Sequence, residues 1–282
     1  MNKVERISEL VLVATPIGNL EDLSPRAIKT LTEADVVACE DTRRTGRLFQ
    51  SVGIKKRKLL RVDAHKEDQV VNQILNFLHD GLSVAMVSDA GTPGISDPGQ
   101  RLVSQVAQAG YKVSVVPGPS APIAALVVSG LPTDRWCMEG FLPRKGVARE
   151  ERLIQIAVEE RTTVVFETAQ RLETTLREML EVFGGNRYVV IVRELTKIYE
   201  EVWRGTLAEA SVNYEQRPKG ELVLVIEGSS SVAEISDSRV QAMLVDICST
   251  GVSTRDAAVE VASLLGVSKS HAYRLALKIK NA

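Results

Sequence analysis

Short runs of apolar, often β-branched residues alternate along the chain with longer segments whose apolar positions recur at helical spacing. The apolar runs predict strands at 10–14, 35–39, 83–88, 112–116, 163–167, 188–193 and 222–227. Several runs are apolar throughout, which is typical of strands that are covered on both faces. Helical spacing marks the segments 24–33, 67–80, 97–109 and 170–183. The alternation of the two patterns predicts α/β layers.

Two breaks divide this pattern into domains. The first is Gly130-Leu131-Pro132-Thr133, and the second is Gly228 with the three serines that follow it. We predict two α/β domains at 1–131 and 132–230, followed by a small helical domain at 237–282. The helical domain reads as three helices at 238–249, 254–265 and 269–280. The short turn 265–268 between the last two is typical of a helix-turn-helix.

Composition excludes several classes of protein. The chain has 282 residues, of which 44% are hydrophobic and 25% charged, so disorder, collagen and coiled coil are excluded for the chain as a whole. The net charge is −1, so any nucleic-acid binding requires a local basic patch. Three distant cysteines without a C-x-x-C motif argue against a disulfide framework and a cysteine zinc site. These features favour a reducing cytoplasm.

No segment predicts secretion or a membrane span. The apolar run 10–14 is too short for the core of a signal peptide. The segment 113–133 is uncharged and long enough to cross a bilayer, but it contains four prolines and two glycines. We expect it to form a strand, a turn, a buried helix and a second turn in a soluble protein.

Four turn segments lie at the carboxyl ends of predicted strands. They are 15–20 (TPIGNL), 39–45 (CEDTRRT), 88–99 (SDAGTPGISDPG) and 117–122 (PGPSAP). Ligands of open α/β sheets bind outside the carboxyl ends of the strands, and glycines allow the backbone to approach a ligand closely. Each turn by itself is equally well explained as a plain connection. Four such turns at one edge of the same sheet favour a binding site.

The common nucleotide and hydrolase motifs are absent from the sequence. There is no G-x-G-x-x-G after the first strand and no G-x-x-x-x-G-K-[ST], so a Rossmann dehydrogenase and a P-loop NTPase lose support. The G-x-S-x-G elbow is absent as well.

The motifs nevertheless resemble one family when taken in order. VATPIGNLEDLSPRA, EDTRRTGRL, VSDAGTPGISDPG, VPGPSAPIAAL and EGFLPRKG are similar to the tetrapyrrole methylase superfamily, and RELTKIYEE and KGELVLVIEG continue the likeness. Within that superfamily the chain resembles the members that methylate the 2′-hydroxyl of a cytidine in small-subunit ribosomal RNA. The likeness covers about residues 10–228 and continues into the helical tail.

This resemblance implies an S-adenosylmethionine-dependent enzyme that holds its cofactor between two α/β domains and acts as a homodimer. It also implies the decoding region of 16S RNA in the assembled 30S subunit as the substrate. The cofactor-binding positions that it implies are Gly18, Asn19, Asp89, Gly91, Thr92, Ser120, Ala121, Phe166, Leu195 and Gly220. The last three rest on less distinctive motifs than the others.

The chemistry of these residues agrees with such a cofactor, which carries a cationic end, a carboxylate and an adenine. Asp89 suits the cationic end, although a turn-capping role would also explain it. The start of the predicted helix at 120–128 offers unpaired N–H groups and a positive dipole end for the carboxylate.

Methyl transfer to a ribose also needs groups that orient the 2′-oxygen and remove its proton. The candidates for these roles are Glu40, Asp41, Arg43, His65, Arg193, Glu194 and Lys197. Asp41 is suited to orient the ribose or accept a proton, and Arg43 to hold a phosphate. An ordinary ion pair would also explain Glu194 and Lys197. The residues alone do not select the base.

Three basic clusters are candidates for RNA contact. The last predicted helix carries Lys269, His271, Arg274, Lys278 and Lys280, and the tail 237–282 has six basic and four acidic residues. The other clusters are Arg144, Lys145, Arg149 and Arg152, and the run 55–58. Aromatic residues make up only 4% of the chain, which favours backbone and shape recognition over base stacking.

Two other functions fit parts of the sequence. A methylase of a tetrapyrrole carbon or of a diphthine-type side chain would share the fold, but the basic clusters and the tail disfavour it. A DNA-binding regulator would use the tail to read duplex DNA and the α/β part as a ligand sensor, which the turn sequences disfavour.

Overall fold

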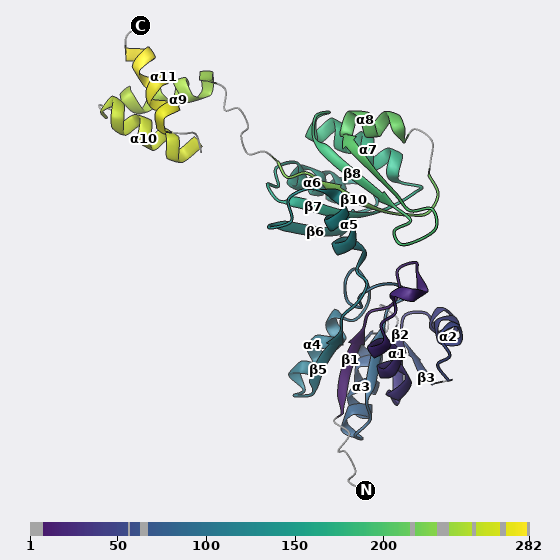
Figure 1. Cartoon of the computed structure of the whole chain (residues 1–282). Helices are drawn as coiled ribbons and strands as arrows, with labels where there is room; N and C mark the ends of the chain where they lie inside the picture. The colour runs from purple at the N-terminus through teal and green to yellow at the C-terminus, as the bar shows by residue number, and fades with distance from the viewer. Residues whose placement is uncertain are drawn as a thin grey trace. The chain divides into compact units, whose positions relative to one another are not determined.

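The chain forms two compact units, Met1–Gly228 and Ser229–Ala282, seen in the computed structural model of Figure 1. The structure describes residues 8–55, 57–62, 67–214, 218–229, 237–249, 252–265 and 269–280. The first unit holds two five-stranded sheets, and the second holds helices. The α/β class predicted from the alternating pattern is confirmed.

The first sheet is entirely parallel. Its strands, in the spatial order β3-β2-β4-β1-β5, are β1 (Glu9–Val13), β2 (Val36–Cys39), β3 (Lys58–Arg61), β4 (Val84–Val87) and β5 (Lys112–Val116). The helices between them are η1 (Leu20–Asp22), α1 (Pro25–Glu33), α2 (Thr42–Ser51), α3 (Glu67–His79) and α4 (Gln100–Gln108). Buried residues of α1 and α2 pack on one face, and those of α3 and α4 pack on the other. This double cover explains why β2 and β4 are apolar and buried throughout.

The second sheet mixes strand directions. Its order is β6-β7-β10-β8-β9, with β6 (Trp136–Phe141), β7 (Thr162–Thr168), β8 (Tyr188–Arg193), β9 (Glu201–Thr206) and β10 (Glu221–Ile226). Only β6 and β7 are parallel. One face packs against α6 (Val147–Ala157), α7 (Leu172–Phe183) and α8 (Leu207–Asn213). The other packs against α5 (Ala121–Ser129), whose Ala125 and Leu126 contact the sheet although α5 precedes the predicted boundary at residue 131.

The predicted helix starts and ends agree with the structure to within a few residues. Ser24 caps α1, because its hydroxyl accepts the Ala27 N–H at 3.1 Å and Pro25 occupies the first turn. The prediction of a turn over 39–45 is wrong in part, because only Glu40 and Asp41 connect β2 to a helix. Asp41 caps α2 there, and Thr42 begins the helix.

Three strands and several helices carry too weak a pattern to be predicted from the sequence. β3 has four residues and a lysine at its start, β6 has an irregular register between Met138 and Gly140, and β9 interleaves charged residues. Helices α2, α6 and α8 were also not predicted. Helix α2 is mostly polar, α6 carries the buried Arg149 among its apolar positions, and α8 has only seven residues, so each gives a weak apolar pattern.

The second unit contains the three predicted helices, α9 (Asp237–Ser249), α10 (Thr254–Leu265) and α11 (Lys269–Lys280). Their shared core includes Val240, Leu244, Val261 and Leu275. The predicted turn between α10 and α11 lies mostly outside the described residues. No helix in the described part of the chain is long and apolar enough to cross a membrane. The uncharged segment 113–133 contains most of β5 and all of α5, a strand followed by a helix as predicted.

Candidate functional site

Three glycine- and proline-rich loops meet at the carboxyl edge of the first sheet. Thr15 and Gly91 exchange two backbone hydrogen bonds, of 2.9 and 3.0 Å, which join the loops after β1 and β4. The Thr92 hydroxyl donates to the Pro119 carbonyl at 3.0 Å and ties in the loop after β5. The prediction that these loops share one edge of the sheet is confirmed.

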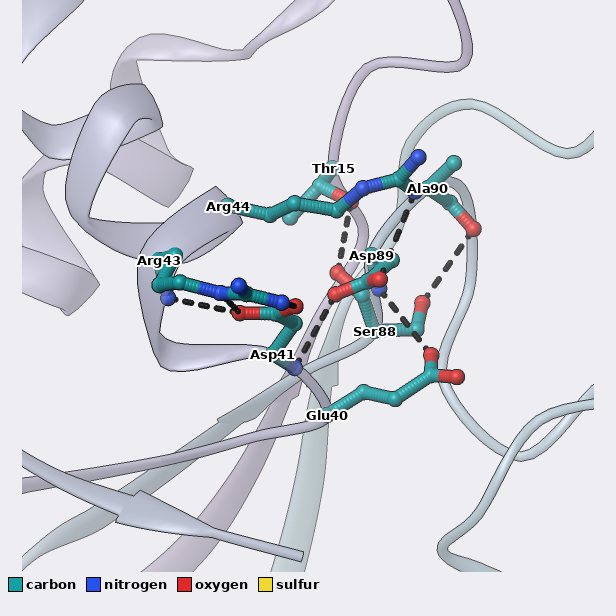
Figure 2. Close-up of polar contacts among 8 residues, drawn as sticks. All are labelled: Thr15, Glu40, Asp41, Arg43, Arg44, Ser88, Asp89 and Ala90. Carbon is teal, nitrogen blue, oxygen red and sulfur yellow. Dashed lines mark hydrogen bonds and ion pairs between the residues drawn. The ribbon is translucent and has the colours of Figure 1, made fainter.

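Asp89 connects this edge to the start of α2, as Figure 2 shows. One carboxylate oxygen accepts the Asp41 N–H at 3.1 Å, and the other pairs with Arg44 at 3.3 Å. Asp41 in turn caps α2, and its carboxylate accepts hydrogen bonds from the backbone N–H and the guanidinium of Arg43. Asp89 is therefore held in position by two contacts at the start of α2, one with the Asp41 N–H and one with Arg44.

A polar pocket of about 400 Å³ opens beside this network. Its lining comes from the first loop, from α2, from the loop after β4 and from the second sheet: Thr15, Pro16, Ile17, Gly18, Leu20, Arg44, Thr45, Arg47, Leu48, Ser51, Ser88, Asp89, Ala90, Lys197 and Glu221. It brings together predicted residues from both sheets, Gly18 and Asp89 with Lys197.

The loop between β8 and β9 closes one side of the polar pocket. Glu194 and Thr196 have φ angles of 51° and 65°, a left-handed backbone that is strained for side chains of this kind. The turn places the Thr196 hydroxyl 3.2 Å from the Asn19 N–H, and a Cβ on Gly18 would overlap Lys197 and Thr196. A strained turn of the second sheet thus fits against a glycine of the first loop.

Lys197 lies between two carboxylates. Its ammonium donates to Glu194 at 2.9 Å and to Glu221 at 2.8 Å. Glu194 also accepts the Glu221 N–H at 3.0 Å, and Gly220 has a φ of 105° with no room for a Cβ beside the Glu194 carboxylate. The glycine at 220 is therefore required both by its backbone and by this close approach.

An apolar pocket of about 320 Å³ lies on the second sheet and continues from the polar one. Ile17, Ala90 and Glu221 line both pockets. The remaining lining is Ile95, Ser96, Asp97, Phe141, Phe166, Glu167, Thr168, Val192, Leu195, Gly220, Leu222 and Val223. Phe141 and Phe166 lie 5.3 Å apart between ring centroids and form a wall suited to a planar ring. The predicted residues Phe166, Leu195 and Gly220 all line this pocket.

Asp97 places a carboxylate at the edge of the apolar pocket. Burial, together with the neighbouring Glu40 and Asp89 carboxylates, raises its pKa to about 6, although a hydrogen bond from Ser88 lowers it. Ser96 before it has a φ of 62°, and its hydroxyl lies 3.1 Å from the position of a Cβ on Gly140. A cation bound here would relieve this crowding of carboxylates.

Ser120 and Ala121 begin α5 and are not among the described residues that line either pocket. The Ser120 side chain makes no capping hydrogen bond, so the first N–H groups of α5 remain open to an anion. Thr92 reaches the preceding Pro119, which brings Gly91 and Thr92 next to this helix start.

The proposed catalytic residues differ in how readily each would accept a proton. Hydrogen bonds from Arg43 hold the pKa of Asp41 far below its ordinary value. The Glu221 N–H and then Lys197 lower the pKa of Glu194. Burial lowers the pKa of Lys197, but its hydrogen bonds to Glu221 and Glu194 outweigh burial and raise it. His65 lies outside the described residues.

Sequence reasoning missed several residues that line the pockets. Ile17, Ala90, Asp97 and Phe141 all lie inside the recognised motifs, so the motifs were a usable signal for them. Arg44 and Arg47 line the polar pocket, whereas Arg43 is 85% exposed and pairs with Asp41. Glu221 lies in the KGELVLVIEG motif as well, but its pairing with Lys197 is visible only in the structure.

One predicted basic cluster is wrong in part. Arg149 is buried, where it donates to Glu178 at 2.7 Å and to the Thr175 hydroxyl at 2.7 Å. Arg152 pairs with Glu139 at 3.2 Å. Of that cluster only Arg144 and Lys145 remain exposed without such a partner in the described part of the chain.

Comparison with known proteins places this geometry in a family. The family model of the Tetrapyrrole (Corrin/Porphyrin) Methylases matches residues 9–211. The chain is 41% identical over 274 residues to ribosomal RNA small subunit methyltransferase I of Haemophilus influenzae, covering 95% of this chain and 96% of that one. It is 48% identical over 235 residues to the protein of the same name from Xylella fastidiosa, covering 82% and 86%.

Solved structures show the same fold at low sequence identity. Cobalt precorrin-4 methyltransferase, a cobalamin biosynthetic enzyme, matches with a TM-score of 0.59 and 18% identity, covering 80% of this chain and 97% of that one. Uroporphyrin-III C-methyltransferase from Thermus thermophilus, complexed with S-adenosylhomocysteine, matches with a TM-score of 0.54 and 20% identity, covering 77% and 96%.

Proposed function

This chain belongs to the tetrapyrrole methylase family, and on that premise we propose that it methylates small-subunit ribosomal RNA with S-adenosylmethionine as the methyl donor. More specifically, we propose the 2′-hydroxyl of a cytidine in the decoding region of 16S RNA as the acceptor and the assembled 30S subunit as the substrate. Relatives at 41% and 48% identity that are named for small-subunit ribosomal RNA support the RNA class.

The observation that carries the proposal is the pair of pockets that share Ile17, Ala90 and Glu221. The walls of one include two phenylalanines and several aliphatic side chains, and the walls of the other include two arginines, a lysine and two carboxylates beside apolar residues. A methyl donor with an adenine and a methyl acceptor with a ribose and phosphates need two such neighbouring environments.

The residues present fit S-adenosylmethionine. Phe166, Leu195 and Val223 suit the adenine, and the crowded carboxylate of Asp97 suits a positively charged group. The open start of α5 at Ser120 and Ala121 suits the carboxylate of the methionine part. When bound, the cofactor supplies an electrophilic methyl group on a sulfonium.

The side chains of the polar pocket have distinct roles in this proposal. Lys197 keeps its proton and uses two of its three N–H groups on Glu194 and Glu221, so a third can stabilise negative charge on the attacking oxygen. Asp41 and Glu194 act by position, because their lowered pKa values make them weak proton acceptors. Arg44 and Arg47 line the route of a phosphate.

A homodimer is a further part of the proposal. Helix α5 is apolar on nearly all sides, and Ile123 and Val127 are 46% and 67% exposed on the face that does not cover the second sheet. Val115 of the edge strand β5 is 52% exposed. Apolar exposure of this kind supports a protein partner, and size-exclusion chromatography with light scattering tests whether it is a second copy.

We also propose that the helical unit contacts RNA and that the protein acts in the cytoplasm. Lys269, Arg274 and Lys278 of α11 are exposed, and α11 has no acidic residue. A basic helix of this kind contributes contacts to phosphates. The three free cysteines agree with a reducing compartment.

The test of the proposed function is transfer of labelled methyl from S-adenosylmethionine. Unmethylated 30S subunits, protein-free 16S RNA and a sample without RNA are compared, with Asp89→Ala as the inactive control. We expect label on RNA, more of it on subunits than on free RNA, and none with the variant. If no RNA is labelled while a porphyrin or corrin precursor accepts the methyl group, the tetrapyrrole alternative is correct.

A further inference from the structure

The strongest basic stretch of the chain lies on α2 and β3 rather than in the helical unit. Residues 42–61 contain eight Lys or Arg and no Asp or Glu, in a chain whose net charge is −1. The tail 237–282 contains six basic and four acidic residues. The 42–61 stretch therefore creates the larger local positive field.

Most of these cations reach solvent. Arg43, Arg44, Arg47, Lys55, Lys58 and Arg61 are exposed. Arg43 pairs with Asp41 and Arg44 with Asp89, whereas Arg47 and Lys55 form no ion pair with any residue that the structure describes. Arg44 and Arg47 are three residues apart on α2 and so lie on one face of the helix.

A groove of about 520 Å³ lies between α2 and β3, and we call it the α2–β3 groove. It is lined by Gly46, Phe49, Gln50, Ile54, Arg57 and Leu59. Arg57 is half-buried there and donates through Nη2 to the Thr32 carbonyl, while its Nε has no hydrogen-bond partner among the described residues. No ion pair with Arg57 occurs among the residues that the structure describes, and an anion in the groove would be a suitable partner for its guanidinium.

The groove and the polar pocket lie along the same helix. Gly46 and Gln50 line the groove, and Arg47 and Ser51, the residues that follow them, line the polar pocket. A chain of phosphates that crosses α2 would therefore meet Arg57, Lys55, Arg47 and Arg44 and then enter the pocket. The spacing of phosphates along a nucleic-acid strand suits such a series of cations.

We propose that the α2–β3 groove and the cations of α2 bind the sugar–phosphate backbone of the RNA beside the target nucleotide. This inference rests on the proposed function and deepens it by naming the docking surface. Protection of an edge strand by lysines would account for Lys58 but not for Arg44, Arg47 and Lys55, which lie on a helix and a loop. An anionic membrane is a poorer partner, since 42–61 contains no exposed large apolar side chain among its described residues.

The decisive variant adds negative charge to the groove without touching the polar pocket. Gln50→Glu with Lys55→Glu changes one groove-lining residue and one exposed loop residue, for a net change of −3. The matched control, Gln105→Glu with Arg177→Glu, makes the same charge change at exposed positions on α4 and α7. Binding to unmethylated 30S subunits and to transcribed 16S RNA is measured over a range of salt concentrations.

We expect the groove variant to bind RNA at least about 10-fold more weakly near physiological salt, with a shallower salt dependence, and the control to bind within about twofold of wild type. S-adenosylhomocysteine affinity, measured on the same samples, should be unchanged and reports that the fold is intact. A second variant, Arg47→Gln with Lys55→Gln, removes two cations and should lower the slope of log K against log salt by about 1.4–1.8.

Equal RNA affinity and salt slope for the groove variant and its control would overturn the inference, and so would wild-type binding to phosphatidylserine vesicles but not to RNA. The result is separable from the proposed function, because the assay needs no methyl transfer. Salt-dependent RNA binding that is lost in the groove variant, with no methylation of RNA, would contradict the proposed reaction and leave this surface standing.

Discussion

The two sheets of the first unit contribute different chemistry to one site. On the side of the parallel sheet, the loop after β4 supplies Asp89 and Asp97, and helix α2 supplies Arg44. The mixed sheet supplies an apolar wall, with Phe166 and Val223, and an ionic network around Lys197. We infer that the side chains of the first sheet recognise the charged groups of a ligand and those of the second sheet recognise its shape. Variants of the first sheet should therefore change the affinity for charged groups, and variants of the second the affinity for an apolar ring.

The largest effect is expected from Asp89→Ala in the first sheet. The variant leaves the Asp41 N–H without its acceptor and Arg44 without its partner, which misplaces the start of α2. We expect the affinity for S-adenosylhomocysteine to fall about 100-fold, equivalent to about 2.7 kcal/mol, as measured by calorimetry. An unchanged dissociation constant would show that Asp89 does not belong to the cofactor-binding site.

Gly220→Ala tests the contact between the two halves of the site. A Cβ at this position meets the Glu194 carboxylate, and the backbone φ of 105° is unfavourable for alanine. We expect about 10-fold slower methyl transfer and a loss of about 1–3 kcal/mol in the free energy of unfolding. Gly81→Ala is the matched control, because its φ is 78° but open space surrounds it, so only the backbone cost applies and the transfer rate is retained.

Phe166→Ala tests the apolar wall of the second sheet. Its ring contacts Phe141 and lines the apolar pocket, so truncation removes surface that would cover an adenine. We expect the affinity for S-adenosylhomocysteine and for free adenosine to fall by the same factor of about 10, as burial of one aromatic side chain would suggest. A loss confined to the full cofactor would mean that Phe166 acts on the charged end instead.

Asp97→Asn has the smallest expected effect and gives the pH dependence. Burial, with Glu40 and Asp89, raises the pKa of Asp97 to about 6, above its value of 3.8 in an unfolded chain. The folded state therefore binds more protons than the unfolded state between about pH 4 and pH 6, and the free energy of unfolding falls as the pH rises through this window.

Asparagine at position 97 carries no charge, so Asp97→Asn avoids the loss of stability that ionisation of the buried carboxyl causes above about pH 6. We expect Asp97→Asn to raise the free energy of unfolding at pH 7 by about 1 kcal/mol after solvent screening, and to lose this advantage below about pH 4. Denaturant titrations at both pH values measure it. The exposed Asp134→Asn is the control and should change stability at neither pH. A variant that is less stable than wild type at pH 7 would contradict the crowding of carboxylates.

The sequence was most informative where loops carry glycine and proline. The motifs around Gly18, Gly91 and Ser120 predicted loops that meet, because the carboxyl ends of parallel strands share an edge. The strained turn at Glu194 and Thr196 could not be predicted, because no local pattern marks a left-handed backbone at residues other than glycine.

Long-range pairing was equally hidden from the sequence. Arg149 looks like part of a basic surface but is buried by α7, which brings Glu178 and Thr175 to it from 29 and 26 residues away. In the same way, the mostly polar residues 42–45 were predicted to form a turn. They begin helix α2, which is stabilised by its Asp41 cap and by the packing of Phe49 in the core.

The most direct test of the account identifies the methylated atom. Small-subunit RNA labelled by the wild-type protein is digested completely to nucleosides, which are separated and weighed by mass spectrometry. We predict one labelled species, 2′-O-methylcytidine. Label on a cytosine base, on another nucleoside or on no nucleoside at all would contradict it.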